Sequence, residues 1–204
     1  MTRMHIGGPW RCFPSRIRRF KSWTLVCGTG LELQFLFERL PGAQVTCIDL
    51  SEEMLAILRE HYQERARQIE IIRTSYLRWE YPTRRYDYAI SVNTMHHLEE
   101  TEKTKLYAKI RRSLKPGGIY VESDFMVDEA TMEQYRASFR RLVQDLPVKE
   151  SGYYHIDIPF TVDIQKKLLL KAGFGEVKVF YENIRPEGSS GILVARVDSF
   201  IKNT

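Results

Sequence analysis

The sequence lacks any long hydrophobic run. Hydrophobic residues make up 43% of the 204 positions, yet no apolar stretch approaches the ~20 residues that a membrane-spanning helix needs. Internal repeats and low-complexity tracts are also missing. A chain of this length suits one domain with a single hydrophobic core. We therefore expect one folded domain and no membrane partner.

Cysteine is scarce. The three cysteines, Cys12, Cys27 and Cys47, are odd in number, form no CxxC pair and have no flanking His that would complete a metal site. This pattern favours neither a disulfide framework nor a structural zinc site, and it is typical of a reducing compartment. We expect a cytoplasmic protein without a bound metal.

Acidic residues are missing from the start of the chain. Residues 1–22 hold six of the 31 basic residues and none of the 26 acidic ones, so the net charge of +5 is concentrated there and residues 23–204 are nearly neutral. Proteins that bind nucleic acid show a basic face on the folded body, because phosphate neutralisation supplies much of their affinity. We predict a basic irregular arm over 1–22, a domain over 23–204, and no nucleic-acid partner.

From residue 23 onward, short apolar runs alternate with helix-period stretches. This alternation predicts an α/β fold with a mostly parallel sheet covered by helices on both faces. The last two strands must be antiparallel, because a parallel return needs a crossover of a dozen residues or more. The expected strands are 23–26, 44–49, 69–73, 86–92, 119–123, 176–181 and 192–197, and the expected helices are 30–40, 52–67, 101–114, 128–144 and 162–171.

Glycines mark the bend between the first expected strand and helix. In the run 27–30, Gly28 and Gly30 let the backbone approach a ligand closely, and the helix that follows offers free N–H groups. Asp49 closes the next strand, where a carboxylate can accept both hydroxyl hydrogens of an adenosine ribose. Two alternatives are a tight turn without a ligand and a nicotinamide dehydrogenase, whose third glycine is replaced here by Leu33.

Four segments over residues 24–123 resemble the class I S-adenosylmethionine-dependent methyltransferases in order and spacing: VCGTGLELQFL, VTCIDLSEEML, YDYAISVNTMHHL and LKPGGIYVES. The segment GYYHIDIPFTVDIQKKLLLKAGFGEVKVFYEN is similar to bacterial small-molecule members. The resemblance implies a Rossmann-like sheet of seven strands with an antiparallel last strand. It also implies S-adenosyl-L-methionine as cofactor and a small-molecule acceptor with an O, N or C nucleophile, in a monomer or homodimer.

The resemblance also implies which residues contact the cofactor. Gly28 and Gly30 would meet the methionine part and Asp49 the ribose, while Ser75 and Tyr76 stand where the family usually has an Asp for the adenine amino group. The full set of implied cofactor-binding residues is Cys27, Gly28, Thr29, Gly30, Asp49, Leu50, Met54, Ser75, Tyr76, Asn93 and His97.

The sequence departs from the family pattern at three places. Thr24 stands where the family has an acid that helps to hold the methionine amino group, and the β-branched Val26 replaces a glycine at the bend. Residues 1–22 do not resemble the helix that covers the cofactor in the family, and a frameshifted or truncated gene is one hypothesis for that stretch. These departures favour an alternative function, a degenerate methyltransferase fold that acts as a non-catalytic binding or scaffold protein.

Methyl transfer requires positioning, exclusion of water and sometimes removal of a proton. The sequence offers His97, just past the fourth expected strand, as one candidate catalytic residue. Its neighbour His96 is expected to point elsewhere, because adjacent side chains usually diverge. The alternative is that both histidines pack within a strand-to-helix loop.

Two further catalytic candidates lie later in the chain. Asp124 and Glu122 are two residues apart on a strand and so share a face near the carboxyl edge of the sheet, where the pair could contact the acceptor. The alternative is that the two acids form a solvated strand end. His155 lies in an aromatic segment with Asp157, which could orient it as a general base. The alternative there is aromatic packing against the sheet edge.

Overall fold

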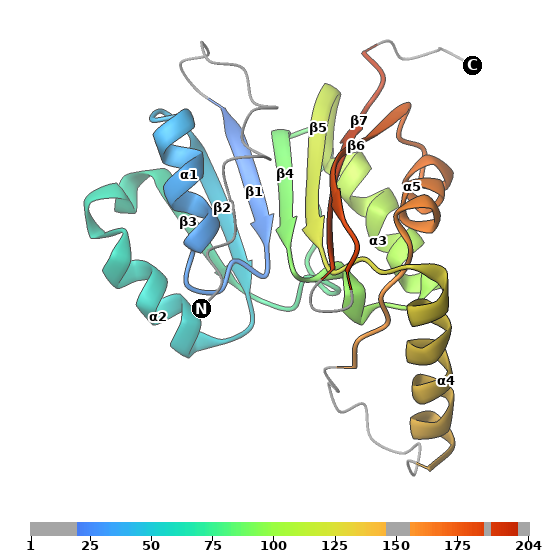
Figure 1. The fold of residues 1–204 in the computed structure, drawn as a ribbon. Coiled ribbons are helices and arrows are strands. Elements are labelled where there is room, and N and C mark those ends of the chain that lie inside the picture. Colours follow the sequence, from blue (N-terminus) through green and yellow to red (C-terminus); the bar gives the residue numbers. More distant parts are fainter. Residues whose placement is uncertain (1–19, 146–155, 186–188, 200–204) are drawn as a thin grey trace.

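The structure is a computed structural model, and it describes residues 20–145, 156–185 and 189–199. Its described part contains a seven-stranded sheet with the order β3-β2-β1-β4-β5-β7-β6 (Figure 1). The strands are β1 (Lys21–Leu25), β2 (Gln44–Asp49), β3 (Ile69–Arg73), β4 (Tyr86–Val92), β5 (Leu114–Asp124), β6 (Glu176–Asn183) and β7 (Ser190–Arg196). Neighbours from β3 to β5 pair in parallel, and β7 runs antiparallel to both β5 and β6. The expected fold class and the antiparallel last strand are confirmed.

Helices cover both faces of the sheet (Figure 1). The helices are α1 (Leu31–Arg39), α2 (Glu52–His61), α3 (Glu100–Ser113), α4 (Glu129–Asp145) and α5 (Val162–Lys171), with two 3₁₀ helices, η2 (Gln63–Gln68) and η3 (Met95–His97). Buried side chains of α1 and α2 share one hydrophobic cluster, and those of α3 and α5 share another. The molecule therefore has one core on each side of the sheet.

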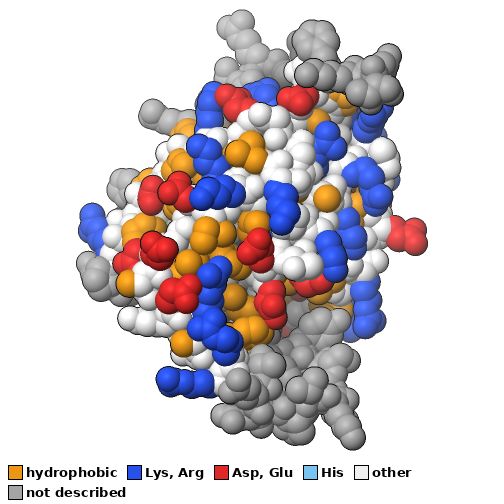
Figure 2. Space-filling model, turned by 90° about the vertical axis from the view of Figure 1, so that its right-hand side faces the viewer, with side chains coloured by type: hydrophobic (Ala, Val, Ile, Leu, Met, Phe, Trp, Pro, Cys, Tyr) orange, Lys and Arg blue, Asp and Glu red, His pale blue; other side chains and the backbone are white. Residues whose placement is uncertain are grey.

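The carboxyl ends of the parallel strands lie together at one edge of the sheet, where α4 extends away from it (Figure 1). Ligands of open α/β sheets bind beyond this edge. Within the part of the chain that the structure describes, no helix combines the length and apolar character needed to cross a bilayer. On the side of the molecule facing the viewer in Figure 2, basic and acidic side chains are interspersed with hydrophobic ones.

Element boundaries differ from the sequence expectation at four strands and, by more than one residue, at one helix. β6 and β7 differ by one or two residues at their ends, and the helix expected over 52–67 ends at His61, where the 3₁₀ helix η2 follows. β1 begins at Lys21 and ends at Leu25, because Lys21 pairs with Gln44 and Val26 leaves the strand with a φ of 49°. The expected domain start at 23 thus falls inside this strand. Residues 1–19 of the expected arm lie outside the described residues.

The start of β5 is also earlier than expected. The turn predicted over 115–118 is part of the strand, which begins at Leu114 because this residue pairs with Tyr86. Gly117 adopts a φ of 75°, and the pairing register shifts between Tyr86 and Tyr88. A bulged strand with a left-handed glycine has the same local sequence as a turn, so the two could not be distinguished from sequence.

Candidate cofactor and acceptor site

The loop after β1 is bent by left-handed backbone at Val26, Gly28 and Gly30, whose φ angles are 49°, 50° and 78°. A Cβ on Gly28 would meet no described atom within 4 Å, so this glycine lines open space. A Cβ on Gly30 would lie 3.0 Å from the Tyr62 ring and 3.3 Å from Leu58. Gly30 is therefore required by packing of α1 on α2, whereas Gly28 leaves room for a ligand.

Asp49 ends β2 directly beside this loop. Its carboxylate accepts hydrogen bonds from the Gly28 N–H at 2.8 Å and from the Ser51 N–H at 2.9 Å, one on each oxygen. The residue is 7% exposed. Each carboxylate oxygen has a second lone pair, so the two amides fix the orientation of Asp49 without saturating it.

Glu32 is a further candidate site residue, one that sequence reasoning did not suggest. The buried Thr24 hydroxyl donates to Glu32 Oε1 at 2.8 Å, which ties the first turn of α1 to the end of β1. Burial, aided by the nearby Asp49 carboxylate, raises the pKa of Glu32 to about 7, although hydrogen bonds from its own backbone and from Thr24 act in the opposite direction. One sequence feature could have identified Glu32: position 24 lacks the acid of the family pattern, while the first turn of the next helix carries one.

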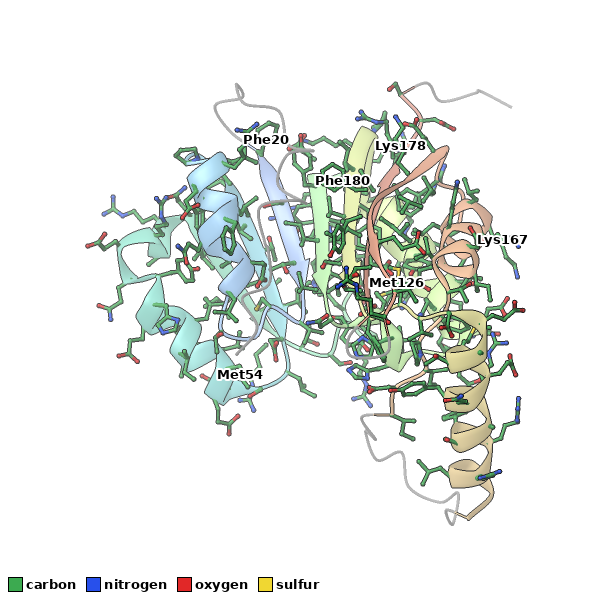
Figure 3. The ribbon with its side chains drawn as sticks, in the orientation of Figure 1. Phe20, Met54, Met126, Lys167, Lys178 and Phe180 are labelled. Carbon is green, nitrogen blue, oxygen red and sulfur yellow. The ribbon has the colours of Figure 1, made fainter. Side chains whose placement is uncertain are left out.

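The implied adenine-contacting residues lie around the end of β2 and β3. Leu50 and Met54 are 51% and 45% exposed. Met54 is labelled near the start of α2 in Figure 3, beyond the carboxyl end of β2. Ser75 is buried and Tyr76 partly buried in the segment after β3. Thr74, which precedes them, donates its N–H to the Asp49 carbonyl at 2.9 Å.

The end of β4 brings a second group of polar side chains to the same edge. Asn93 adopts a φ of 49° and donates its N–H to the Ser123 carbonyl at 2.9 Å, so the chain turns sharply into η3. The two η3 histidines do not diverge as expected. The ring centroids of His96 and His97 are 4.0 Å apart, and both rings approach Asp157.

Asp124 is paired with His96 rather than with solvent. It is 1% exposed and accepts from His96 Nδ1 at 2.5 Å and from the Phe125 N–H at 2.9 Å. The interpretation of Glu122 and Asp124 as a solvated strand end is therefore wrong. His96 was given no role from sequence, whereas the structure places it between Asp124 and Asp157. The candidate base His155 lies outside the described residues.

Glu122 belongs to a separate buried network behind the site. Its carboxylate accepts from the Tyr107 hydroxyl at 2.7 Å, the Tyr120 hydroxyl at 3.0 Å and Gln165 Nε2 at 2.5 Å. Lys103, which is fully buried, donates to Gln165 Oε1 at 3.2 Å and lies over the Phe160 ring. Burial raises the pKa of Glu122 and lowers that of Lys103.

A family model described as a methyltransferase domain matches residues 24–118. Malonyl-(acyl-carrier protein) O-methyltransferase of Geobacter sulfurreducens is 28% identical over 159 residues, which cover 76% of this chain and 56% of that protein. Carboxy-S-adenosyl-L-methionine synthase of Wolinella succinogenes is 28% identical over 171 residues, which cover 78% and 70%. The chain thus spans little more than half the length of the first of these relatives.

Solved structures share the fold. Phosphoethanolamine N-methyltransferase 2 of Haemonchus contortus in complex with S-adenosyl-L-methionine has a TM-score of 0.68 at 18% identity, covering 92% of this chain and 50% of that one. The 1,6-didemethyltoxoflavin-N1-methyltransferase of Burkholderia thailandensis has a TM-score of 0.63 at 19% identity, covering 89% and 72%. The family model and the relatives indicate a class I S-adenosylmethionine-dependent methyltransferase. The strand order and the solved structures show the fold of that family.

Proposed function

We propose that the protein binds S-adenosyl-L-methionine and transfers its methyl group to an O, N or C nucleophile of a small molecule. The observation that carries this proposal is the Asp49 carboxylate, held by the amides of Gly28 and Ser51 beside the open space at Gly28. A fixed carboxylate next to a backbone without a side chain suits a ribose with two hydroxyls.

With the ribose at Asp49, the positions of the other residues that would contact the cofactor follow. Cys27 and Thr29 belong to the same bend, and Leu50 and Met54 offer exposed apolar surface for the adenine ring. Ser75 and Tyr76 lie next to that surface along the edge of the sheet. Asn93, at the turn after β4, faces the reactive end of the cofactor in this arrangement.

Glu32 takes over the task that the family gives to an acid at position 24. It brings a carboxylate to the Thr24 hydroxyl and close enough to Asp49 for repulsion between them. Two carboxyl groups in one cleft favour a ligand with positive charge, and the cofactor carries an ammonium and a sulfonium group.

The acceptor would lie against His96, His97 and Asp157, beyond the ends of β4 and β5. A surface cavity of about 390 Å³ opens there; its lining residues include His97, Leu98, Phe139, Ile156 and Ile158. Methyl transfer is an in-line displacement that needs the acceptor atom about 3–3.5 Å from the methyl carbon. Nitrogen atoms of the two imidazoles can take up a proton from the acceptor, and Asp124 acts through His96 as a positioning residue.

Calorimetry with S-adenosylmethionine and S-adenosylhomocysteine tests the proposal directly. We expect one site per chain with a dissociation constant in the micromolar range, and transfer of a labelled methyl group to small molecules of a bacterial metabolite extract. Binding without transfer to any fraction would favour the non-catalytic alternative. Absence of heat and of a thermal shift at millimolar ligand would rule out both cofactor binding and catalysis.

Replacing Glu32 by Gln should weaken cofactor binding by about 10- to 150-fold, because a charge-assisted hydrogen bond is worth about 1.5–3 kcal/mol. In the wild type, affinity should rise from pH 5.5 to 7, since the Glu32 pKa of about 7 means that binding a cation must first ionise it. The α-amino group of the ligand stays protonated over this range. Calorimetry at several pH values should show this slope in the wild type and its loss in the variant.

The same substitution should stabilise the free protein. An acid whose folded-state pKa is raised binds more protons when folded, so its contribution is present below pH 4.5 and is lost as pH rises through 7. Glu32→Gln removes this loss and should raise the melting temperature at pH 8. Glu38→Gln, at an exposed position on the same helix, is the control and should change neither quantity; equal effects of both variants would contradict the assignment.

A further inference from the structure

We propose that His96, His97 and Asp157 bind a divalent transition-metal ion at the carboxyl edge of β4 and β5, with Asp124 holding His96 in the binding orientation. The three side chains each offer one ligand atom, and these atoms lie within 4.8 Å of one another. They come from two segments, η3 and the stretch before α5, which are about 60 residues apart in sequence.

The two distances from Asp157 to the imidazole nitrogens fit a shared ion. Asp157 Oδ1 is 3.3 Å from His97 Nδ1 and 3.6 Å from His96 Nε2. Both values exceed the ~2.7–2.9 Å of a charge-assisted N–H···O bond. Two ligand atoms that are each about 2.0–2.1 Å from one tetrahedral ion are roughly 3.4 Å apart, so this arrangement matches an ion better than direct pairing.

Asp124 supplies the outer contact that metal-binding histidines require. A histidine ligand almost always donates its second ring N–H to a carboxylate or carbonyl, which fixes the nitrogen that faces the metal. His96 Nδ1 contacts Asp124 Oδ1 at 2.5 Å, and the Phe125 N–H holds the same oxygen. The lone pair of His96 Nε2 is then directed toward Asp157. The same contact explains why the Asp124 carboxylate is buried.

The segment that carries Asp157 is fixed to η3 by the backbone. The Ile158 N–H donates to the His96 carbonyl at 2.6 Å, directly after Asp157. Two residues later, Phe160 forms a parallel bridge with Met126, just past β5, and accepts from the Val127 N–H at 3.2 Å. Met126 is labelled at this edge of the sheet in Figure 3. The ligand set is therefore assembled by the fold before any ion binds.

The donor types select the class of metal. Two imidazoles with one carboxylate suit zinc, cobalt, nickel or iron(II), whereas magnesium and calcium prefer oxygen ligands alone. The side chains of His96, His97 and Asp157 are 10%, 26% and 44% exposed, so the ion would keep positions open toward the cleft. Three protein ligands with an open position are typical of a reactive rather than a structural site.

An open position here would bind an oxygen or nitrogen atom of the methyl acceptor. This last step rests on the proposed function, because it takes the acceptor to lie beside η3. A bound cation lowers the pKa of a coordinated hydroxyl group. With the ion bound, the acceptor proton would go to solvent, because the imidazole nitrogens that could accept it in the metal-free protein would bind the ion. The acceptor class would then be compounds with an ionisable hydroxyl next to a second donor atom, which can bind through both.

The test is titration of the full chain, purified without a histidine tag and freed of metal with a chelator, with cobalt(II) and zinc(II) in the absence of cofactor. Visible absorption of the cobalt form should saturate at one equivalent. We expect His97→Ala and Asp157→Asn to lower the affinity at least ~100-fold. Asp124→Asn should lower it about 10–100-fold, the usual cost of losing an outer contact.

His61→Ala and Asp163→Asn are matched controls on the exposed sides of α2 and α5 and should leave the titration unchanged. Asp157 is the most exposed of the three ligands, at 44%, so its variant should fold even if a histidine variant does not, and circular dichroism checks this. Equal binding by the wild type and Asp157→Asn would overturn the metal site. Metal binding without cofactor binding would instead retain this site and contradict the proposed function.

Discussion

Replacing Asp49 by Ala should lower the affinity for S-adenosylmethionine by at least ~100-fold. Two hydrogen bonds between a carboxylate and the ribose hydroxyls are worth about 1.5–3 kcal/mol each, and 1.4 kcal/mol corresponds to a factor of ten. The substitution also frees the amides of Gly28 and Ser51, which Asp49 now holds at 2.8 and 2.9 Å. Calorimetry with the cofactor measures the loss.

Three ligands separate this effect from that of Glu32. Loss of Asp49 should weaken the binding of S-adenosylmethionine, S-adenosylhomocysteine and 5′-methylthioadenosine to a similar extent, because all three ligands carry the ribose. Glu32→Gln should spare 5′-methylthioadenosine, which has no amino-acid part. Asp163→Asn, the exposed control, should bind all three as the wild type does. Unchanged affinity of Asp49→Ala would remove the basis for placing the ribose at the end of β2.

Sequence reasoning placed the fold well because each cue it used was local. Periodicity located each expected helix and strand near its observed position. The errors at β1 and β5 arise because pairing partners far away in sequence decide where these strands begin. Lys21 extends β1 by pairing with Gln44, and Leu114 extends β5 by pairing with Tyr86.

The site was harder to predict because its side chains meet through tertiary structure. The glycine bend and Asp49 follow a fixed strand-to-helix spacing, so they could be read directly. Glu32 and His96 could not be assigned this way, since each becomes significant only through a partner on another element, Thr24 for the first and Asp124 for the second. Burial of Asp124 likewise depends on segments that follow it in the chain.

Replacing Glu122 by Ala should destabilise the protein by about 3–5 kcal/mol, the usual cost of removing one member of a buried charged network. The substitution leaves Tyr107, Tyr120 and Gln165 without their shared acceptor and removes one of the two carboxylates, with Asp124, that act on the buried Lys103. A domain of this size loses about 2–4 °C in melting temperature per kcal/mol. We therefore expect a drop of roughly 6–20 °C by thermal unfolding.

Two further variants test whether the loss of stability comes from the buried hydrogen bonds of Glu122. Glu182→Ala, at an exposed position on β6, should change stability by less than about 0.5 kcal/mol. Glu122→Gln keeps an acceptor oxygen for the tyrosines and should cost clearly less than Glu122→Ala. A loss below 1 kcal/mol in the Ala variant would show that the network adds little to stability.

The location of this network also predicts which function survives. Glu122 and Asp124 share β5, whereas Asp49 and Gly28 belong to the half of the sheet covered by α1 and α2. At a temperature where Glu122→Ala is still folded, cofactor affinity should stay within a few-fold of the wild type, because the ribose and adenine contacts lie on the other half. Metal affinity should fall more, because β5 positions Asp124 and through it His96.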